Sequence, residues 1–399
     1  MASSISLPFV IWHNFTNPNT TSLACNPPHV YAGQKDGHIW VYQMSLDPPT
    51  LQHKFLLVGH KAPVVALCVI KNHTNSLSND DVLISAAEDG EIARWSVVDG
   101  RCQAVNNSGF MGVPRYLKVF KQFSSRHIFC CGQSNDIFIL NATTLEVVSV
   151  WGGHANWVVC TDFCPERILS STGAQQQGQQ PKLVTMTMDG RLDTWNFDVS
   201  KQIIYKDKSI LHQPLSSDQT VSTFNAHFDL ISSDSTPGIC MALTDEKVVI
   251  FALHNNNEFI PHITLPAKSG TSWTGGVFCE TNRLMIWTQN GDIYDYVLHP
   301  PQGVKTGSMA SNEQQLYYTE TLVQSYSMDE NACGMPESRF TAVYEDTSDG
   351  MIALLSVAND IERSTYGIQI TASDISTDIN TTSPSPAKNL SLGWCGPDR

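Results

Sequence analysis

The sequence predicts an all-β protein, a seven-bladed β-propeller in which small antiparallel sheets follow one another around a ring. One short motif recurs seven times: a small or acidic turn pair, one residue, an aliphatic residue, two residues, and then an aromatic or large aliphatic residue. Successive copies begin 45 to 59 residues apart, which suits one four-stranded blade with loop insertions. No segment shows a sustained apolar period of about 3.6 residues, so we expect little helix.

The copies differ in how well they keep the motif. Five are clear: Asp36–Tyr42, Asp89–Trp95, Asp189–Trp195, Asn290–Tyr296 and Asp349–Leu355. Two are degenerate: Ser134–Leu140 and Asp245–Phe251. An Asp-Gly or Asn-Gly pair makes a tight hairpin turn, because glycine accepts a positive φ without steric cost. The alternating apolar residues that follow predict a strand, and we expect the final aromatic to fill the gap between neighbouring sheets.

Apolar runs just before the turns predict the preceding strand of each sheet. They are Val82–Ser85, Ile128–Cys131 and Leu183–Met186. The longer intervals contain polar or Gly- and Pro-rich segments, which we interpret as loop insertions that folding does not need. These are Lys71–Asp80, Gly173–Pro181 and Pro300–Gln314.

The two ends of the chain have different predicted roles. The apolar segment Ser6–Trp12 precedes the first motif, and we expect it to complete the last sheet as its outer strand. The propeller is expected to occupy residues 1–360. After Asp360 the chain becomes rich in Ser, Thr, Asp and Pro, so residues 361–399 are predicted to be a linker or a disordered tail.

Composition narrows the function classes. Hydrophobic residues make up 41% of the chain and charged residues 16%, which suits a globular protein. The formal net charge of −14 disfavours binding to nucleic acid and direct docking on anionic lipid. Eleven cysteines lack the spacing of a disulfide framework, and the start lacks a signal-peptide pattern. We therefore expect a cytoplasmic protein.

Two Gly-His pairs, Gly59-His60 and Gly153-His154, precede the aromatics Trp95 and Trp195. This arrangement resembles the WD-repeat family, in which a His, a strand Ser or Thr, the turn Asp and the Trp form a buried hydrogen-bonded tetrad. The resemblance implies two structural tetrads. They are His60, Ser85, Asp89 and Trp95 in one sheet, and His154, Thr185, Asp189 and Trp195 in another.

A further stretch is more specific: Trp273, Thr274, Gly275 and Gly276, followed by Trp287 and the motif Asn290–Tyr296. Together with Leu7–Trp12, Asp36–Trp40 and Leu57–His60 it resembles, in the same order, the amino-terminal propeller of the rabconnectin-3 beta family. That resemblance implies a scaffold in a complex with a large rabconnectin-like partner. The complex promotes assembly of the vacuolar proton ATPase, and thereby organelle acidification, at vesicle, endosome or vacuole membranes.

Other interpretations of the same residues remain open. His60, Ser85 and Asp89 contain the residue types of a hydrolase triad, but their spacing favours the tetrad. His154, Cys160 and Cys164 lack a CxxC pair or fourth ligand for zinc. The Trp273–Gly276 segment can be a partner-binding loop or a strand with a bulge. Trp151 and Trp157 flank Gly153-His154, either as interface anchors or as packing residues.

These patterns favour a non-catalytic protein-interaction scaffold without cofactor, metal or catalytic residues. The alternative is a generic WD-repeat adaptor, such as a ubiquitin-ligase substrate receptor or a vesicle-coat component. An enzyme built on a propeller ranks last, because no catalytic set survives inspection.

Overall fold

The computed structural model describes residues 9–13, 20–26, 28–46, 49–70, 81–107, 110, 112–120, 126–164, 182–198, 203–211, 221, 223–227, 239–253, 259–280, 283–288, 292–299, 317–324, 339–347, 350–358 and 366–373. Within these ranges the regular elements are all strands, and no helix is present.

The described residues form seven four-stranded antiparallel sheets. Sheet 1 contains β2 (Thr20–Asn26), β3 (His29–Gln34), β4 (Ile39–Leu46) and β5 (Pro49–Leu57), and sheet 2 contains β6 (Val64–Ile70), β7 (Val82–Ala87), β8 (Ile92–Ser96) and β9 (Cys102–Asn106). Sheet 3 contains β10 (Pro114–Lys118), β11 (His127–Gly132), β12 (Ile137–Asn141) and β13 (Val147–Trp151), and sheet 4 contains β14 (Val158–Cys164), β15 (Lys182–Thr187), β16 (Arg191–Asp198) and β17 (Ile203–Leu211). Sheet 5 contains β18 (Thr223–His227), β19 (Ile239–Leu243), β20 (Lys247–Leu253) and β21 (Phe259–Pro266), and sheet 6 contains β22 (Trp273–Glu280), β23 (Arg283–Thr288), β24 (Ile293–His299) and β25 (Tyr317–Gln324). Sheet 7 contains β26 (Arg339–Thr347), β27 (Gly350–Ala358), β28 (Tyr366–Ser373) and β1 (Phe9–His13).

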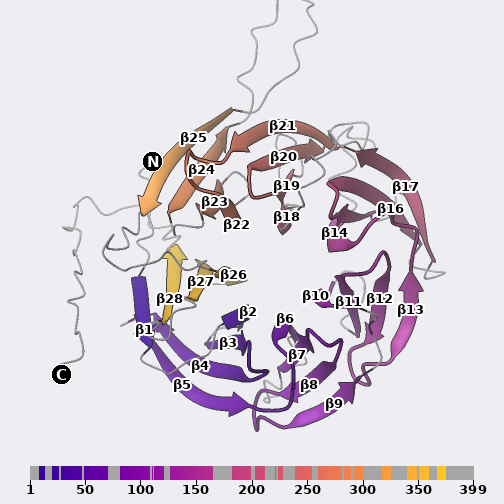
Figure 1. Cartoon of the computed structure of the whole chain (residues 1–399), viewed down its shortest axis with the longest axis vertical. Coiled ribbons are helices and arrows are strands. Elements are labelled where there is room, and N and C mark those ends of the chain that lie inside the picture. The colour runs from indigo at the N-terminus through magenta and orange to yellow at the C-terminus, as the bar shows by residue number, and fades with distance from the viewer. Residues whose placement is uncertain are drawn as a thin grey trace, which may run out of the picture.

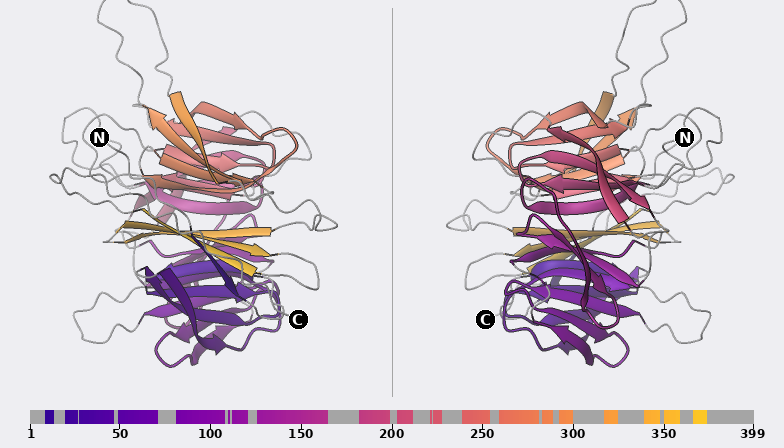
Figure 2. Two further views of the ribbon diagram at one scale, coloured as in Figure 1. Left: turned by 90° about the vertical axis from the view of Figure 1, so that its left-hand side faces the viewer. Right: turned by 90° about the vertical axis from the view of Figure 1, so that its right-hand side faces the viewer.

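The sheets stand side by side around a common axis (Figure 1). In sheets 1 to 6 the first strand is innermost and the last outermost, and in sheet 7 β26 is innermost and β1 outermost. Seen from the side, their strands lie within one layer, so the ring is a thick disc (Figure 2). This arrangement follows from the sequence, because sheets 1 to 6 each come from one contiguous segment whose strands pair in chain order, and sheet 7 adds the amino-terminal β1 to β26, β27 and β28.

Sheet 7 joins the two ends of the chain. Strand β1 pairs antiparallel with β28, with Phe9 opposite Ile370 and His13 opposite Tyr366. The prediction that the amino-terminal apolar segment completes the last sheet is therefore confirmed, and the strand runs from Phe9 to His13 rather than from Ser6 to Trp12. Because β28 spans Tyr366–Ser373, the predicted end of the propeller at residue 360 is too early, and part of the predicted tail is a strand.

The turn chemistry inferred from the motif is present in three sheets. Gly37, Gly90 and Gly190 have φ values of 88°, 91° and 82°, the left-handed region that a side chain disfavours. The apolar runs predicted to precede the motif copies at Asp89, Ser134 and Asp189 lie in β7, β11 and β15. The insertions predicted at 71–80, 173–181 and 300–314 lie outside the described residues.

The core lies between neighbouring sheets rather than at the centre of the ring. One cluster joins sheets 1 and 2 through Tyr31, Val41, Leu57 and Trp95, and another joins sheets 3 and 4 through Phe129, Ile139, Leu183 and Trp195. Side chains alternate along each strand, so one face of a sheet packs on the preceding sheet and the other on the following one. The motif aromatics Trp95 and Trp195 face the preceding sheet, as the sequence predicts.

One end of the ring is tied by backbone hydrogen bonds between successive sheets. We call it the turn end, because the hairpins between the second and third strands lie there. At three junctions a backbone N–H at the entry to a first strand donates to the hairpin of the preceding sheet: Val158 to Ser134 (3.0 Å), Val221 to Met188 (2.9 Å) and Trp273 to Asp245 (2.8 Å). At these junctions the hairpin helps to set where the entering chain lies.

Candidate functional site

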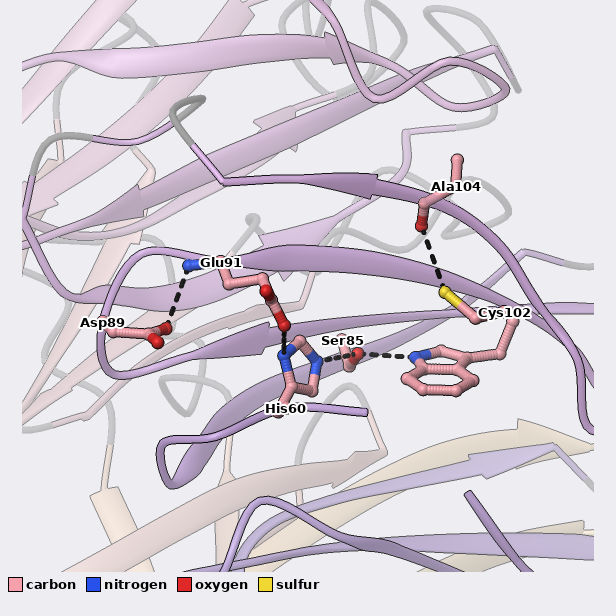
Figure 3. A network of polar contacts seen from close by, with 7 residues as sticks. His60, Ser85, Asp89, Glu91, Cys102 and Ala104 are labelled. Atoms are coloured by element: carbon pink, nitrogen blue, oxygen red, sulfur yellow. Dashed lines mark hydrogen bonds and ion pairs between the residues drawn. The ribbon is translucent and has the colours of Figure 1, made fainter. Parts of the chain in front are cut away.

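Sheet 2 contains a chain of buried polar groups (Figure 3). His60 lies in the loop before β6, Ser85 on β7 and Trp95 on β8. The Nε2 atom of His60 is 2.6 Å from Oγ of Ser85, and Nε1 of Trp95 donates to the same oxygen over 2.8 Å. On its other side, Nδ1 of His60 is 2.6 Å from Oε1 of Glu91.

The donors and acceptors of this chain assign its protons. The Glu91 carboxylate can only accept, so His60 carries its hydrogen on Nδ1 and donates it there. Neutral His60 then accepts at Nε2 from the Ser85 hydroxyl, whose oxygen accepts the indole N–H of Trp95. Every polar atom of the His60, Ser85 and Trp95 side chains has a partner, which removes the cost of burying them.

The acidic partner is not the one expected from the family. Asp89 was expected to hold His60, but its Oδ1 accepts the backbone N–H of Glu91 at 3.2 Å and the side chain is exposed. Glu91, two residues further on, reaches His60 instead. The prediction for Asp89 is therefore wrong in this contact, while His60, Ser85 and Trp95 lie together as expected.

Burial sets the protonation of this site. Desolvation lowers the pKa of His60 below its usual value of 6.5, although the Glu91 carboxylate opposes the shift. Gly59, which precedes His60, supports the same packing. A Cβ at Gly59 would lie 2.6 Å from Cη2 of Trp95, so only glycine lets the loop lie against the indole.

Sheet 4 repeats part of this chain. Trp195 Nε1 donates to Thr185 Oγ1 over 2.9 Å, and the rings of His154 and Trp195 lie 4.7 Å apart. His154 Nδ1 lies 2.9 Å from the carbonyl oxygen of Asn135, in the hairpin of sheet 3. The Nε2 atom of His154 is buried and has no hydrogen-bond partner within the described part of the chain.

The turn acid of sheet 4 again differs from expectation. Asp189 accepts a hydrogen bond from Thr187 Oγ1 at 2.6 Å and does not bond His154. Where sheet 2 has Glu91, sheet 4 has Arg191, which cannot accept a hydrogen bond from an imidazole. His154 therefore uses a backbone carbonyl. Burial lowers its pKa below 6.5, and the Asn135 contact opposes the shift.

The family-signature residues lie at the start of sheet 6. Trp273 is 2% exposed, donates through Nε1 to the Leu265 carbonyl at 3.3 Å, and meets Tyr294 edge to face. A Cβ at Gly275 would lie 2.5 to 2.6 Å from three indole atoms of Trp287, so glycine is required there. Gly276 faces Met241 of sheet 5. The Thr274 side chain lies outside what the structure describes.

These contacts favour the structural interpretation of Trp273–Gly276, since both Trp273 and Trp287 are buried. Trp151 and Trp157, the other aromatic pair, differ in burial. Trp151 is 6% exposed and packs against Trp195, whereas Trp157, in the loop entering sheet 4, is 40% exposed. Trp157 therefore remains available as an interface anchor at the turn end.

The geometry of sheet 2 does not suit a hydrolase. Ser85 is fully buried and its oxygen is occupied by Trp95 and His60, so a substrate cannot reach it. Among the described residues, no three His, Cys, Asp or Glu side chains gather as a metal site. Cys160 lies in the core between sheets 4 and 5. No helix long and apolar enough to span a bilayer occurs in the part of the chain that was searched.

Two positions of this site could not be found from the tetrad pattern. Glu91 is the third residue of the motif, and its neighbour Asp89 draws attention first because it fills the family's position. Asn135 contributes only a backbone carbonyl, which has no sequence signature. A third feature, a cavity on sheet 5, arises where the motif is degenerate.

The chain is similar to WD-repeat proteins at low identity. It is 23% identical over 283 residues to WD repeat-containing protein 72 of Homo sapiens, and 24% identical over 277 residues to the Mus musculus protein of that name. Each alignment covers 67% of this chain and 23% of the relative. An uncharacterised WD repeat-containing protein of Schizosaccharomyces pombe is 21% identical over 251 residues, covering 62% of this chain and 22% of the relative.

The chain thus spans about a quarter of the length of these curated relatives. No family model matches it. The relatives carry WD repeats by name, and the described residues form four-stranded antiparallel sheets around a ring. Together these findings support a WD-repeat protein.

Proposed function

We propose that this chain is a non-catalytic protein-interaction scaffold, a seven-bladed WD-repeat propeller acting in a rabconnectin-3-like complex that promotes vacuolar proton ATPase assembly. The observation that supports a scaffold is the use of the polar residues: His60, Ser85 and Trp95 satisfy one another inside sheet 2. They stabilise the ring, and the exposed loops and outer strands are left for partners.

The pump assignment rests on the resemblance in sequence. Its motifs occur in the family's order from Leu7 to Tyr296, and the signature residues Trp273, Gly275 and Trp287 pack together in sheet 6. The proposed partners are a large rabconnectin-like protein and proton ATPase subunits. The proposed place of action is the cytoplasmic side of vesicle, endosome or vacuole membranes.

The test removes the gene in its native cell and measures vacuolar or endosomal pH together with the membrane-bound fraction of peripheral pump subunits. We expect the pH to rise and that fraction to fall. Reintroducing the wild-type gene should restore both. Normal values for both measurements contradict the pump role and favour a generic WD-repeat adaptor, such as a ubiquitin-ligase substrate receptor or a coat component.

A further inference from the structure

Sheet 5 carries a cavity on the face that packs toward sheet 4. Its volume is about 250 Å³. The apolar part of its lining is Val221, Ala242, Val249, Phe251 and Pro261, and the polar part is Thr244, Lys247, His262 and Thr264. Gly190, in the hairpin of sheet 4, completes the wall at the turn end.

The cavity occurs where sheet 5 departs from the polar chain of sheets 2 and 4. Phe251 occupies the motif position of Trp95 and Trp195. In sheets 2 and 4 the residue that bonds the Trp indole lies on the second strand, opposite the residue two positions before the Trp. Ser85 lies opposite Ala93, and Thr185 lies opposite Asp193. In sheet 5 the residue opposite Val249 is Ala242. Because Ala242 and Phe251 are smaller than the Ser or Thr and the Trp of sheets 2 and 4, they leave space in sheet 5.

Lys247 occupies the motif position of Glu91. In sheet 2 the Glu91 carboxylate accepts a hydrogen bond from His60. In sheet 5 the hairpin closes through Thr244 N and the Lys247 carbonyl, 2.8 Å apart, and the Lys247 side chain lines the cavity. No carboxylate lies within ion-pair distance of its ammonium in the described part of the protein, whereas Lys118, Lys206 and Lys268 are each paired.

The size of the cavity decides between classes of ligand. Pockets that hold small-molecule ligands have volumes of about 300–1,000 Å³. A volume of about 250 Å³ instead suits one or two side chains of a protein segment. The apolar part of the lining accommodates methylene groups, and the Lys247 ammonium attracts a negative charge.

We propose that the Lys247 cavity binds one Glu or Asp side chain from a segment of a partner protein, with its carboxylate on the Lys247 ammonium. This inference rests on the proposed scaffold function and names the chemistry of the partner. Asp245 and Glu246 are exposed beside Lys247, so the bound acid should be flanked by neutral or basic residues. The net charge of −14 does not prevent this contact, since charges more than about 8 Å away are screened at physiological salt.

A neighbouring anchor lies at the same end of the ring. The Met188 N–H donates to the carbonyl of Trp157, and the Met188 carbonyl accepts from Val221, which lines the cavity. The exposed Trp157 side chain is thus connected to the cavity wall through the hairpin of sheet 4.

The test uses the full chain and random dodecapeptides displayed on phage. We expect the enriched peptides to share one acidic residue with neutral or basic flanks. A synthetic peptide of that sequence should bind at least about tenfold more weakly to Lys247→Met, and its Glu→Gln form should lose as much on the wild type. The Glu→Gln peptide should lose nothing further on Lys247→Met, because the two changes remove the same contact.

Two further variants separate the cavity from general charge effects. Lys35→Met removes one exposed lysine from the hairpin of sheet 1, at the same end of the ring, and should change affinity less than twofold. Thr264→Trp keeps Lys247 but fills the rim from an exposed position, and should weaken binding as Lys247→Met does. Melting temperatures of all variants show whether they fold.

Enriched peptides without an acid, no enriched peptide, or equal losses in Lys247→Met and Lys35→Met overturn the proposal. The scaffold function is judged separately by the deletion experiment. A chain that proves necessary for pump assembly but enriches no acidic peptide contradicts the cavity proposal alone.

Discussion

The carboxylate of Glu91 lies 2.6 Å from Nδ1 of His60, and this contact ties the hairpin just before β8 to the loop that enters sheet 2. The His60 side chain is fully buried, while that of Glu91 is 22% exposed. The imidazole therefore depends on this single acceptor for its Nδ1 hydrogen. The stability of sheet 2 should be sensitive to Glu91 and much less sensitive to Asp89.

Replacing Glu91 by Ala should lower the free energy of unfolding by about 1–3 kcal/mol, since it leaves the buried His60 N–H without an acceptor. Asp89→Ala should cost less, because Asp89 is exposed and accepts only the Glu91 backbone N–H. Urea unfolding of the two variants measures both losses. If Asp89→Ala is the more damaging change, His60 is held by Asp89 in solution.

The hydroxyl positions of sheets 2 and 4 should differ in importance. Ser85→Ala removes the partner of both His60 Nε2 and Trp95 Nε1, whereas Thr185→Val removes only the acceptor of Trp195. We expect Thr185→Val to cost about 1–3 kcal/mol and Ser85→Ala to cost more. Denaturant midpoints at constant m-value provide the comparison, and equal losses would mean that His60 finds another donor.

Stability should fall in mild acid. Burial lowers the pKa of His60 and His154 below 6.5, so the folded state binds fewer protons than the unfolded state as the pH drops below about 6.5. The free energy of unfolding should therefore decrease from pH 7 toward pH 5, by up to about 1.4 kcal/mol per pH unit for each histidine. The decrease ends for each histidine once the pH passes below its folded pKa.

His154→Phe is the control for this pH dependence. Asp193 and Asp136 raise the pKa of His154 and Lys206 lowers it, but burial dominates. The variant should lose stability at pH 7, and its loss between pH 7 and pH 5 should be smaller than that of the wild type. An unchanged pH dependence, measured by urea unfolding at both pH values, shows that His154 does not contribute.

The signature glycines should respond differently to alanine. Gly275→Ala brings a Cβ within 2.5 Å of the rigid indole of Trp287, an overpacking that should cost about 1–3 kcal/mol. Gly276→Ala meets the flexible Met241 side chain at 3.1 and 3.2 Å and the Met285 carbonyl oxygen at 3.2 Å, contacts longer than the 2.5 Å at Gly275. The melting temperature of Gly275→Ala should therefore be the lower of the two. The opposite order contradicts the packing described for sheet 6.

The strand order and the hairpins could be predicted from the sequence, because they depend on turn residues and on the apolar alternation within each strand. The turn glycines Gly37, Gly90 and Gly190 mark hairpins that only a positive φ allows, and the alternation after them sets the strand faces. Closure by the amino-terminal strand follows from the need to cover a sheet edge. The strand Tyr366–Ser373 was missed because its Gly, Gln, Thr and Ser residues weaken the apolar pattern.

The details of the polar sites were less accessible, because they depend on which side chains reach across strands. The motif places Asp89 and Glu91 two residues apart, and only the fold shows that Glu91 reaches the ring of His60. In sheet 5 the hairpin is one residue shorter, so counting four residues back from Asp245 leads to Met241 instead of Ala242. The cavity beside Lys247 results from this shift and from Phe251 together.

The pairing of β1 with β28 also has a consequence during synthesis of the chain. Strand β1 is made before the other described strands, but its partner β28 is the last of them. At about 5–20 residues per second the interval is on the order of tens of seconds. For that time Phe9–His13 lacks its native hydrogen-bonding strand, and an unpaired strand can pair with another nascent chain. Closure of the ring by β1 is therefore the step of propeller folding most exposed to misassembly between copies.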